Sequence, residues 1–283
     1  MGGDSYSFSS RQDRATRMNY ASNNANDTFK QNVKGAIHEA MDPKGVKLRE
    51  ARDSSVHPRS VPIIIALDET GSMGQIPHYL VQEGLPHMMG RIIEHGTPDP
   101  AILFMGIGDA YCDRAPLQIG QFESGDEKLD EWLTKIYLEG NGGGNGGESY
   151  ALAWYFAAFH TATDAWDKRG EKGFLFTIGD EHCHPDVTHD QLHKIMGHPY
   201  EMDLKALDLH KAASEKYDVF HICLSDGPIL QRWKDMLKER CVEVQDYKMV
   251  PNVISEIVNS RISHVQREGT QRLITRAQGQ LTA

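Results

Sequence analysis

The chain has 283 residues, and 30 Lys and Arg against 40 Asp and Glu give it a formal net charge of −10. The first 60 residues are slightly basic, so the remainder carries 20 basic against 33 acidic side chains, a surface poorly suited to nucleic-acid phosphates. No stretch approaches the roughly 20 apolar residues that span a bilayer, and the start lacks an apolar signal-peptide core. With only four, widely spaced cysteines, these features predict a cytoplasmic protein with no membrane segment and no disulfide framework.

Residues 1–60 are predicted to be an extension of the main domain. The first 26 residues are rich in Ser, Asn and Asp, which predicts that much of this stretch is disordered or draped over the domain. Three basic residues in it are interpreted as a solvated tail: Arg11, Arg14 and Arg17. Apolar residues then recur at every fourth position, at Phe29, Val33, Ile37 and Met41. This spacing predicts a docked helix near 27–41, followed by an extended connection.

Residues 61–266 are predicted to form one α/β domain, and residues 267–283 a frayed tail. The expected strands cover 61–67, 101–107, 117–122, 173–179, 219–224 and 241–244. The expected helices cover 76–95, 126–137, 149–163, 188–196, 203–216, 228–239 and 250–266. This alternation is typical of a doubly wound, mostly parallel sheet with helices on both faces. The alternating pattern of 117–122 indicates an edge strand that is exposed on one face.

The first core strand ends in an unusual group of polar side chains. Its uninterrupted apolar run indicates a parallel strand that is buried on both faces. Asp68, Thr70 and Ser72 then occupy alternate positions on the turn that leaves the strand. Because ligands of open α/β sheets collect outside the carboxyl ends of the strands, we expect a binding site here. Oxygen donors without thiolate or imidazole favour a hard cation, with Mg²⁺ as the first choice and Mn²⁺ or Ca²⁺ as alternatives.

Two later segments strengthen this hypothesis. The glycine-rich loop 140–147 leads to Glu148 and Ser149 at the start of a predicted buried helix. The apolar run 173–179 ends in another carboxylate, Asp180, which we expect to emerge beside Asp68. The glycine loop lacks the Gly-Lys-Ser/Thr ending of a phosphate-binding P-loop.

Together these segments resemble the von Willebrand factor A (vWA) domain and its metal-ion-dependent adhesion site (MIDAS). The family motif Asp-x-Ser/Thr-x-Ser matches Asp68, Thr70 and Ser72, and its later strand-end aspartate matches Asp180. Where most members carry a threonine, this chain resembles the integrin β-subunit branch, which uses a glutamate. The metal ligands implied by the resemblance are Asp68, Thr70, Ser72, Glu148 and Asp180, with Ser149 as the alternative to Glu148.

The resemblance, which covers residues 61–263, also implies a function. Family members commonly bind a protein partner whose acidic residue completes the metal coordination. Intracellular members often act as adaptors of AAA+ ATPases of the MoxR type or within multiprotein assemblies. We therefore expect a metal-dependent protein–protein interaction module, an adaptor or assembly factor, rather than an enzyme.

Two other functions compete with this interpretation. Residues 182–198 contain five of the chain's 14 histidines, and His189 and His193 would share one helix face, a spacing used by zinc sites. This favours a zinc- or Mg²⁺-dependent hydrolase, but no His-Glu-x-x-His motif is present, and surface histidines flanking the crevice explain the cluster more simply. The other alternative is a structural component of a larger particle, with the basic amino-terminal arm as its assembly contact.

Overall fold

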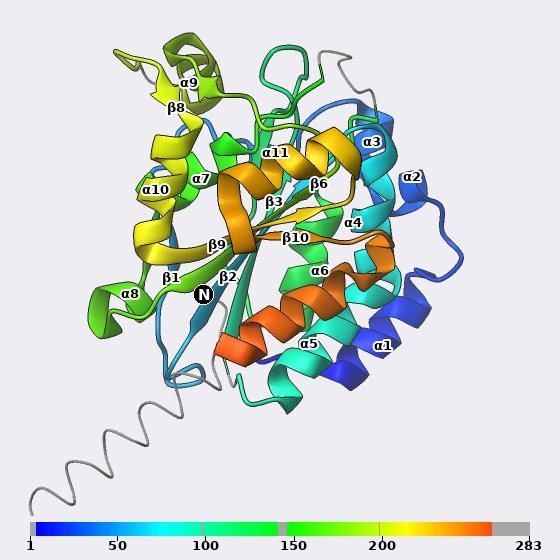
Figure 1. The fold of residues 1–283 in the computed structure, drawn as a ribbon. Coiled ribbons are helices and arrows are strands. Elements are labelled where there is room, and N and C mark those ends of the chain that lie inside the picture. Colours follow the sequence, from blue (N-terminus) through cyan, green and yellow to red (C-terminus); the bar gives the residue numbers. More distant parts are fainter. Residues whose placement is uncertain (1–3, 98, 141–145, 198, 262–283) are drawn as a thin grey trace, which may run out of the picture.

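A six-stranded, mostly parallel sheet forms the centre of the molecule. The computed structural model describes residues 4–97, 99–140, 146–197 and 199–261, apart from the side chain of Ser72. In their order across the sheet the strands are β10 (Cys241–Glu243), β9 (Tyr217–Cys223), β6 (Gly173–Gly179), β2 (Val61–Asp68), β3 (Pro100–Ile107) and β4 (Leu117–Ile119) (Figure 1). Neighbouring strands are parallel, except that β4 is antiparallel to β3. The predicted doubly wound α/β fold is confirmed.

The strand order creates a switch point between β2 and β6. β3 follows β2 in the chain and pairs with one side of it, whereas β6 comes later and pairs with the other side. In such sheets ligands bind in the crevice outside the carboxyl ends of the strands at this point. Asp68 ends β2 and Asp180 directly follows β6, so the chain delivers both carboxylates to the same crevice.

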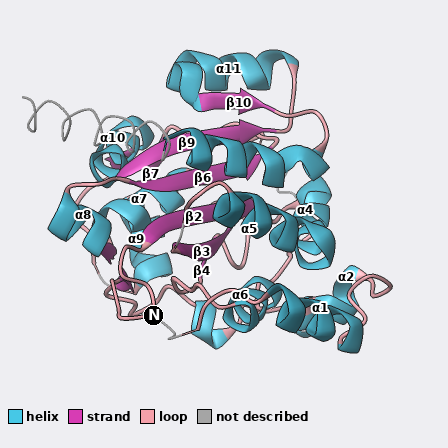
Figure 2. Cartoon of the chain, turned by 90° about the horizontal axis from the view of Figure 1, so that it is seen from below, coloured by secondary structure: helices cyan, strands magenta, loops and turns pink. Residues whose placement is uncertain are grey.

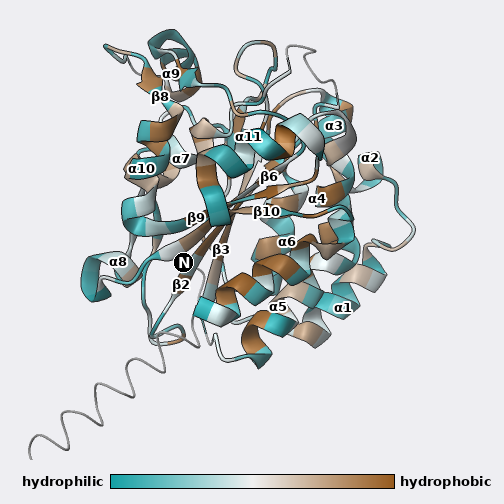
Figure 3. Ribbon diagram, in the orientation of Figure 1, coloured by the Kyte–Doolittle hydropathy of each residue, from teal (hydrophilic) through white to brown (hydrophobic). Residues whose placement is uncertain are grey.

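Helices cover both faces of the sheet (Figure 2). One face packs against α7 (Ala151–Phe159), α9 (His189–Met196), α10 (Ala206–Lys216) and α11 (Gly227–Leu237). The other packs against α4 (Gln75–Tyr79), the π turn η3 (Leu80–Gly84), α5 (Leu85–Glu94), α6 (Asp126–Thr134) and a helix over residues 250–261. Successive residues of β2 enter opposite cores, which explains its unbroken apolar sequence (Figure 3).

Smaller elements complete the described chain. β1 (Arg49–Ala51) pairs in parallel with β5 (Thr161–Thr163), and β7 (Asp186–Val187) pairs antiparallel with β8 (Leu204–Lys205). The short helical elements here are α8 (Asp164–Arg169), η1 (Glu39–Met41), η2 (Gly71–Gly74), η4 (Lys238–Arg240) and η5 (Tyr247–Met249). Within the described ranges, every helix is too short or too polar to cross a membrane.

The described part of the amino-terminal extension, from residue 4, lies over the domain, which is one of the two alternatives expected for it. The solvated tail is wrong for Arg11 and Arg14. Residues 8–17 form helix α1 (Phe8–Arg17). Ser7 caps its start, because the Ser7 hydroxyl accepts a hydrogen bond from the backbone N–H of Ser10. Of the three arginines, only Arg17 is exposed. The composition of the first 26 residues was misleading, because Arg11 and Arg14 dock them through buried ion pairs, together with the buried side chain of Tyr20.

Buried ion pairs hold α1 against α6. Arg14 lies 2.6 Å from Asp126 and 2.8 Å from Asp130, and Arg11 lies 2.8 Å from the other oxygen of Asp130. The arginines are three residues apart on one helix and the aspartates four apart on the other, so each pair shares one helix face. The basic arm is thus bound within its own chain.

The predicted continuous helix near 27–41 is wrong. The segment contains α2 (Ala25–Thr28), α3 (Lys30–Lys34) and the η1 turn instead. Gly35 ends α3 in a left-handed conformation with φ of 64°. Phe29 and Met41 enter the core as expected, but Val33 is 74% exposed, because the break in the helix destroys the common face.

The edge strand is shorter and more buried than expected. β4 ends at Ile119, and Gln118, the polar residue at its centre, is fully buried. The Gln118 side chain donates to the backbone oxygen of Tyr137 over 2.8 Å and accepts from its backbone nitrogen over 2.9 Å. The chain after α6 therefore covers the face that the alternating pattern assigned to solvent.

Candidate metal centre

Asp68 is held in a fixed orientation at the end of β2. Its Oδ1 accepts hydrogen bonds from the backbone nitrogen of Thr70 at 2.9 Å and from the Thr70 hydroxyl at 2.7 Å. Its Oδ2 accepts from the Tyr150 hydroxyl at 2.6 Å. Burial, opposed by these hydrogen bonds and reinforced by the charge of Asp180, raises the pKa of Asp68 to about 6. A carboxylate offers about four lone-pair sites, so Asp68 keeps acceptor capacity for a further partner.

Gly179 gives Tyr150 access to Asp68. A Cβ atom at position 179 would lie 1.9 Å from the Tyr150 hydroxyl and 2.7 Å from Asp68 Oδ2. Only glycine fits between these groups at the end of β6. Asp180 follows immediately and contributes to the raised pKa of Asp68, as expected for carboxylates that emerge side by side.

Glu148 comes from a distant part of the chain to the same place. Its backbone bridges to the loop after Asp180, donating to the His182 oxygen over 2.7 Å and accepting from the His184 nitrogen over 3.1 Å. The side chain is 3% exposed, and its Oε2 is buried without a hydrogen-bond partner. Burial and then the charge of Asp68 raise its pKa to about 9, despite a hydrogen bond with Thr70.

The two remaining predicted residues are placed differently. The Ser149 hydroxyl accepts a hydrogen bond from the backbone nitrogen of Ala110 at 2.9 Å, and the Ser149 nitrogen donates to Gly108 at 3.2 Å. Ser149 therefore fastens the loop after β3, which favours Glu148 over Ser149 as the ligand. Ser72 lies in the η2 turn, but its side chain is outside the described part of the chain.

Sequence reasoning missed several carboxylates at this edge of the sheet. Glu69 is 2% exposed, accepts from the Gln118 side chain, and has a pKa that burial and the charge of Asp68 raise well above its usual value. Asp109 follows β3 and is fully buried, with Asp113 accepting from its backbone nitrogen over 2.6 Å. The position of Asp109 just after a predicted strand was the available signal, because the carboxyl ends of parallel strands share one edge.

This arrangement suits a divalent cation. Oxygens of Asp68 and Thr70 from one segment and of Glu148 from another lie together, and the buried Glu148 Oε2 lacks a partner. Without a cation, burial and then neighbouring carboxylates raise the pKa of Asp68 and of Glu148, whereas a bound divalent charge would favour their ionised forms. Hard oxygen donors match Mg²⁺, Mn²⁺ or Ca²⁺. Across the ranges that the structure describes, however, no three His, Cys, Asp or Glu side chains are grouped as metal ligands.

Two of the histidines of residues 182–198 have separate acidic partners. His184 Nε2 lies 2.9 Å from Asp109 Oδ1, and the ring of His189 lies 2.8 Å from Asp203. His193 is exposed on α9, one turn from His189 as expected from their spacing. His198 lies outside the described residues. Of these, His184 is the histidine linked to the carboxylates of the crevice.

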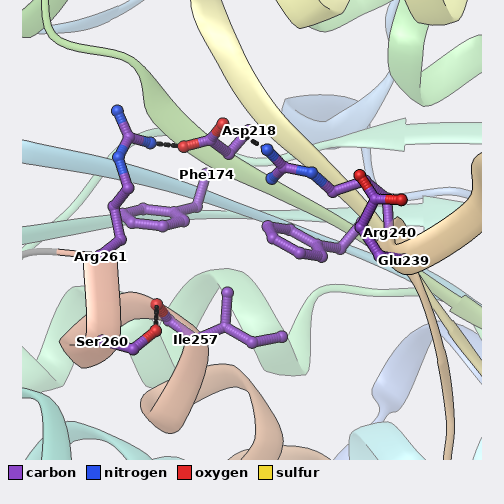
Figure 4. A pocket seen from close by; sticks show the side chains of 8 residues that line it. Phe174, Asp218, Glu239, Arg240, Ile257, Ser260 and Arg261 are labelled. Atoms are coloured by element: carbon purple, nitrogen blue, oxygen red, sulfur yellow. Dashed lines mark hydrogen bonds and ion pairs between the residues drawn. The ribbon is translucent and has the colours of Figure 1, made fainter. Parts of the chain in front are cut away.

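Apart from the candidate metal centre, a second site, a pocket, lies at the opposite edge of the sheet, near the amino ends of β6 and β9. Its volume is about 420 Å³, and Phe174 and Phe220 form an aromatic wall (Figure 4). Asp218 forms ion pairs with both Arg240, at 3.3 Å, and Arg261. Because its arginines already pair within the chain, we assign this pocket to the anchoring of helix 250–261 on the sheet.

Comparisons with known proteins give only loose likenesses. No protein-family model matches the chain, and no curated protein matches its sequence. One similar solved structure is the pilus adhesin SpaC from Lactobacillus rhamnosus GG in its open conformation, with a TM-score of 0.46 and 11% identity over 75% of this chain. Another is proximal thread matrix protein 1 from the mussel byssus, with a zinc-occupied MIDAS motif, a TM-score of 0.43 and 10% identity over 75% of this chain.

The chain spans 31% of the length of the adhesin and 48% of the mussel protein. Likenesses at this level do not bear on function. The fold is therefore assigned from the strand order of this chain.

Proposed function

We propose that the chain is a metal-dependent protein-interaction module that uses a MIDAS-type site. Thr70, Ser72 and Glu148 would hold the cation, with Asp68 and Asp180 supporting it directly or through water. The observation that carries this proposal is the convergence of Asp68, Thr70 and Glu148, where a buried Glu148 oxygen lacks a partner. Burying a polar atom without a partner is costly, and a cation would satisfy it. Mg²⁺ is the first choice, with Mn²⁺ and Ca²⁺ as alternatives.

The bound cation would supply a positive centre with an open coordination position for an acidic residue of a protein partner. The chain's own residues prepare this centre. The Tyr150 hydroxyl and the backbone nitrogen of Thr70 fix the Asp68 carboxylate before any ligand arrives. Because Gly179 has no side chain, the Tyr150 hydroxyl has room to reach the Asp68 carboxylate. Such preorganisation lowers the entropy that the loops lose on binding.

We further propose that binding, and not catalysis, is the role of this centre. The chain would act in the cytoplasm as an adaptor or assembly factor, and an AAA+ ATPase of the MoxR type is the partner class that the vWA resemblance suggests. The acidic charge beyond residue 60 argues against a nucleic-acid partner. The separate partners of His184 and His189 give the hydrolase alternative no support.

Calorimetric titration of the full chain with MgCl2 tests the metal site. The proposal predicts one saturable site that Asp68→Ala and Glu148→Gln weaken at least tenfold. Asp190→Asn is the matched control, since this carboxylate is exposed on α9 and should bind Mg²⁺ as the unaltered chain does. Equal affinities in all four proteins would contradict the site. Affinity capture from native lysate in Mg²⁺ and in EDTA, with Asp68→Ala as the comparison, then tests the interaction role.

A further inference from the structure

A polar groove of about 640 Å³ lies beside the turn that carries Thr70. Three segments that are far apart in the chain form its walls: the α2–α3 region, the η2 turn with the start of α4, and residues 137–140. Figure 1 shows α2 and α3 beside α4. The amino-terminal extension thus builds one wall of a groove that adjoins the candidate metal centre.

Hydrogen bonds fix the walls relative to one another. The side chain of Asn32 accepts from the backbone nitrogen of Leu138 over 2.9 Å and donates to the side chain of Asn26 over 3.2 Å. The extension is thereby tied to the segment after α6. A groove whose walls are fixed before binding loses little conformational entropy when a ligand enters.

The groove is also tied to the metal turn. Gln118 holds the backbone of Tyr137 through two hydrogen bonds and donates a third to Glu69, which follows Asp68 in the chain. Gly71, which directly follows Thr70, lines the groove with φ of 39°, and nothing lies within 4 Å of where its Cβ would be. The groove is therefore open beside Gly71, at its end nearest the metal turn.

The described lining of the groove carries a negative charge. Glu139 is the charged side chain among its described lining residues, beside the amides of Asn26, Asn32 and Gln75. The Glu139 carboxylate is fixed by the backbone nitrogens of Arg114, at 3.0 Å, and Ala115, at 3.3 Å. A basic ligand side chain would complement it, whereas an acidic one would be repelled.

We propose that this groove binds an extended segment of the protein partner in which a Lys or Arg lies close to the acidic residue that reaches the metal. This inference rests on the proposed function, because the acidic residue is anchored at the metal turn. The basic residue would face Glu139 and set specificity, since a partner with acidic residues alone would place like charges together. The amides would bind the main chain of the segment.

Selection of random phage-displayed peptides on the full chain tests the proposal. Peptides are bound in Mg²⁺ and eluted with EDTA. The expected consensus contains an acidic residue with a Lys or Arg nearby. A consensus that is acidic without any basic preference would overturn the groove and leave the metal-dependent function standing. No EDTA-eluted enrichment would overturn both.

Variants of the groove then test the contact with a synthetic consensus peptide in saturating Mg²⁺. Gln75→Lys adds a positive charge to the rim, and Glu139→Gln removes the negative charge. Each should weaken binding about fivefold, the size expected for a partly exposed charge pair. Glu127→Gln, on the exposed face of α6, is the matched control and should bind normally.

A second peptide separates the charge contact from misfolding. When alanine replaces its basic residue, the unaltered chain and Gln75→Lys should bind it equally well. If Gln75→Lys and Glu139→Gln both leave the affinity for the basic peptide unchanged, the groove is not its binding site.

Discussion

Metal binding to this chain should release protons, because the raised pKa of Glu148 keeps its carboxyl protonated near neutral pH. With a pKa of about 9, only about 1% of Glu148 is ionised at pH 7. A cation needs the ionised form, so the apparent affinity should rise about tenfold per pH unit from pH 7 to pH 8 and level off near pH 9. The total gain is about 100-fold, or roughly 2.7 kcal/mol.

Calorimetry in buffers of different ionisation enthalpy measures this release directly. Between pH 7 and 8 about one proton should leave per bound cation, since Asp68, with a pKa of about 6, is already mostly ionised. Below pH 6 the release should approach two protons per bound cation, because Asp68 is then protonated as well. Glu148→Gln should abolish the dependence on pH above 7. Tight binding of Mg²⁺ with a flat pH profile and no proton release would refute the reasoning.

The same carboxyl links pH to the stability of the metal-free chain. In the pH range from about 4.5 to about 9 the folded state keeps a proton on Glu148 that the unfolded state has lost. The contribution of Glu148 to the free energy of unfolding is therefore full below about pH 4.5 and declines as pH rises from there to about 9. Saturating Mg²⁺ should reverse the loss, because it binds the folded ionised form. Thermal unfolding at pH 6 and pH 8.5, with and without Mg²⁺, measures both effects.

Three substitutions test other contacts. Gly179→Ala should push the Tyr150 hydroxyl away from Asp68 and lower the affinity for Mg²⁺ at least tenfold in calorimetry. An unchanged affinity would contradict the role given to this glycine. Arg14→Ala should lower the free energy of unfolding in urea by about 3 kcal/mol, because it leaves buried aspartates short of a counter-charge; a loss below about 1 kcal/mol would show that α1 is not anchored by these pairs. Asp218→Asn should lower the melting temperature by a few degrees while Mg²⁺ affinity stays the same, and a changed affinity would link the second pocket to the metal centre.

The sequence was sufficient for the central sheet and for the positions of two carboxylates at the ends of its strands. Unbroken apolar runs ending in Asp68 and Asp180 have one simple interpretation, buried parallel strands whose ends share an edge. Glu148 was harder to place, since a loop residue carries no periodic signal. Its assignment came from the resemblance, and the structure brings it beside Thr70.

The errors arose where distant segments decide the outcome. Arg11 and Arg14 resemble a solvated tail until Asp126 and Asp130, more than 100 residues later, are brought against them. Gln118 resembles the exposed residue of an edge strand until the backbone of Tyr137 covers it. Local patterns cannot report such contacts, because nothing in the spacing of one segment identifies its partner.

A crystal structure of the full chain with Mn²⁺, located by its anomalous scattering, would test the central claim most directly. We predict one strong peak at the switch point between β2 and β6, within about 2.2 Å of oxygens from Thr70, Ser72 and Glu148. A peak among the histidines of residues 182–198, or an Mn²⁺-saturated crystal with no peak beside Thr70, would contradict it.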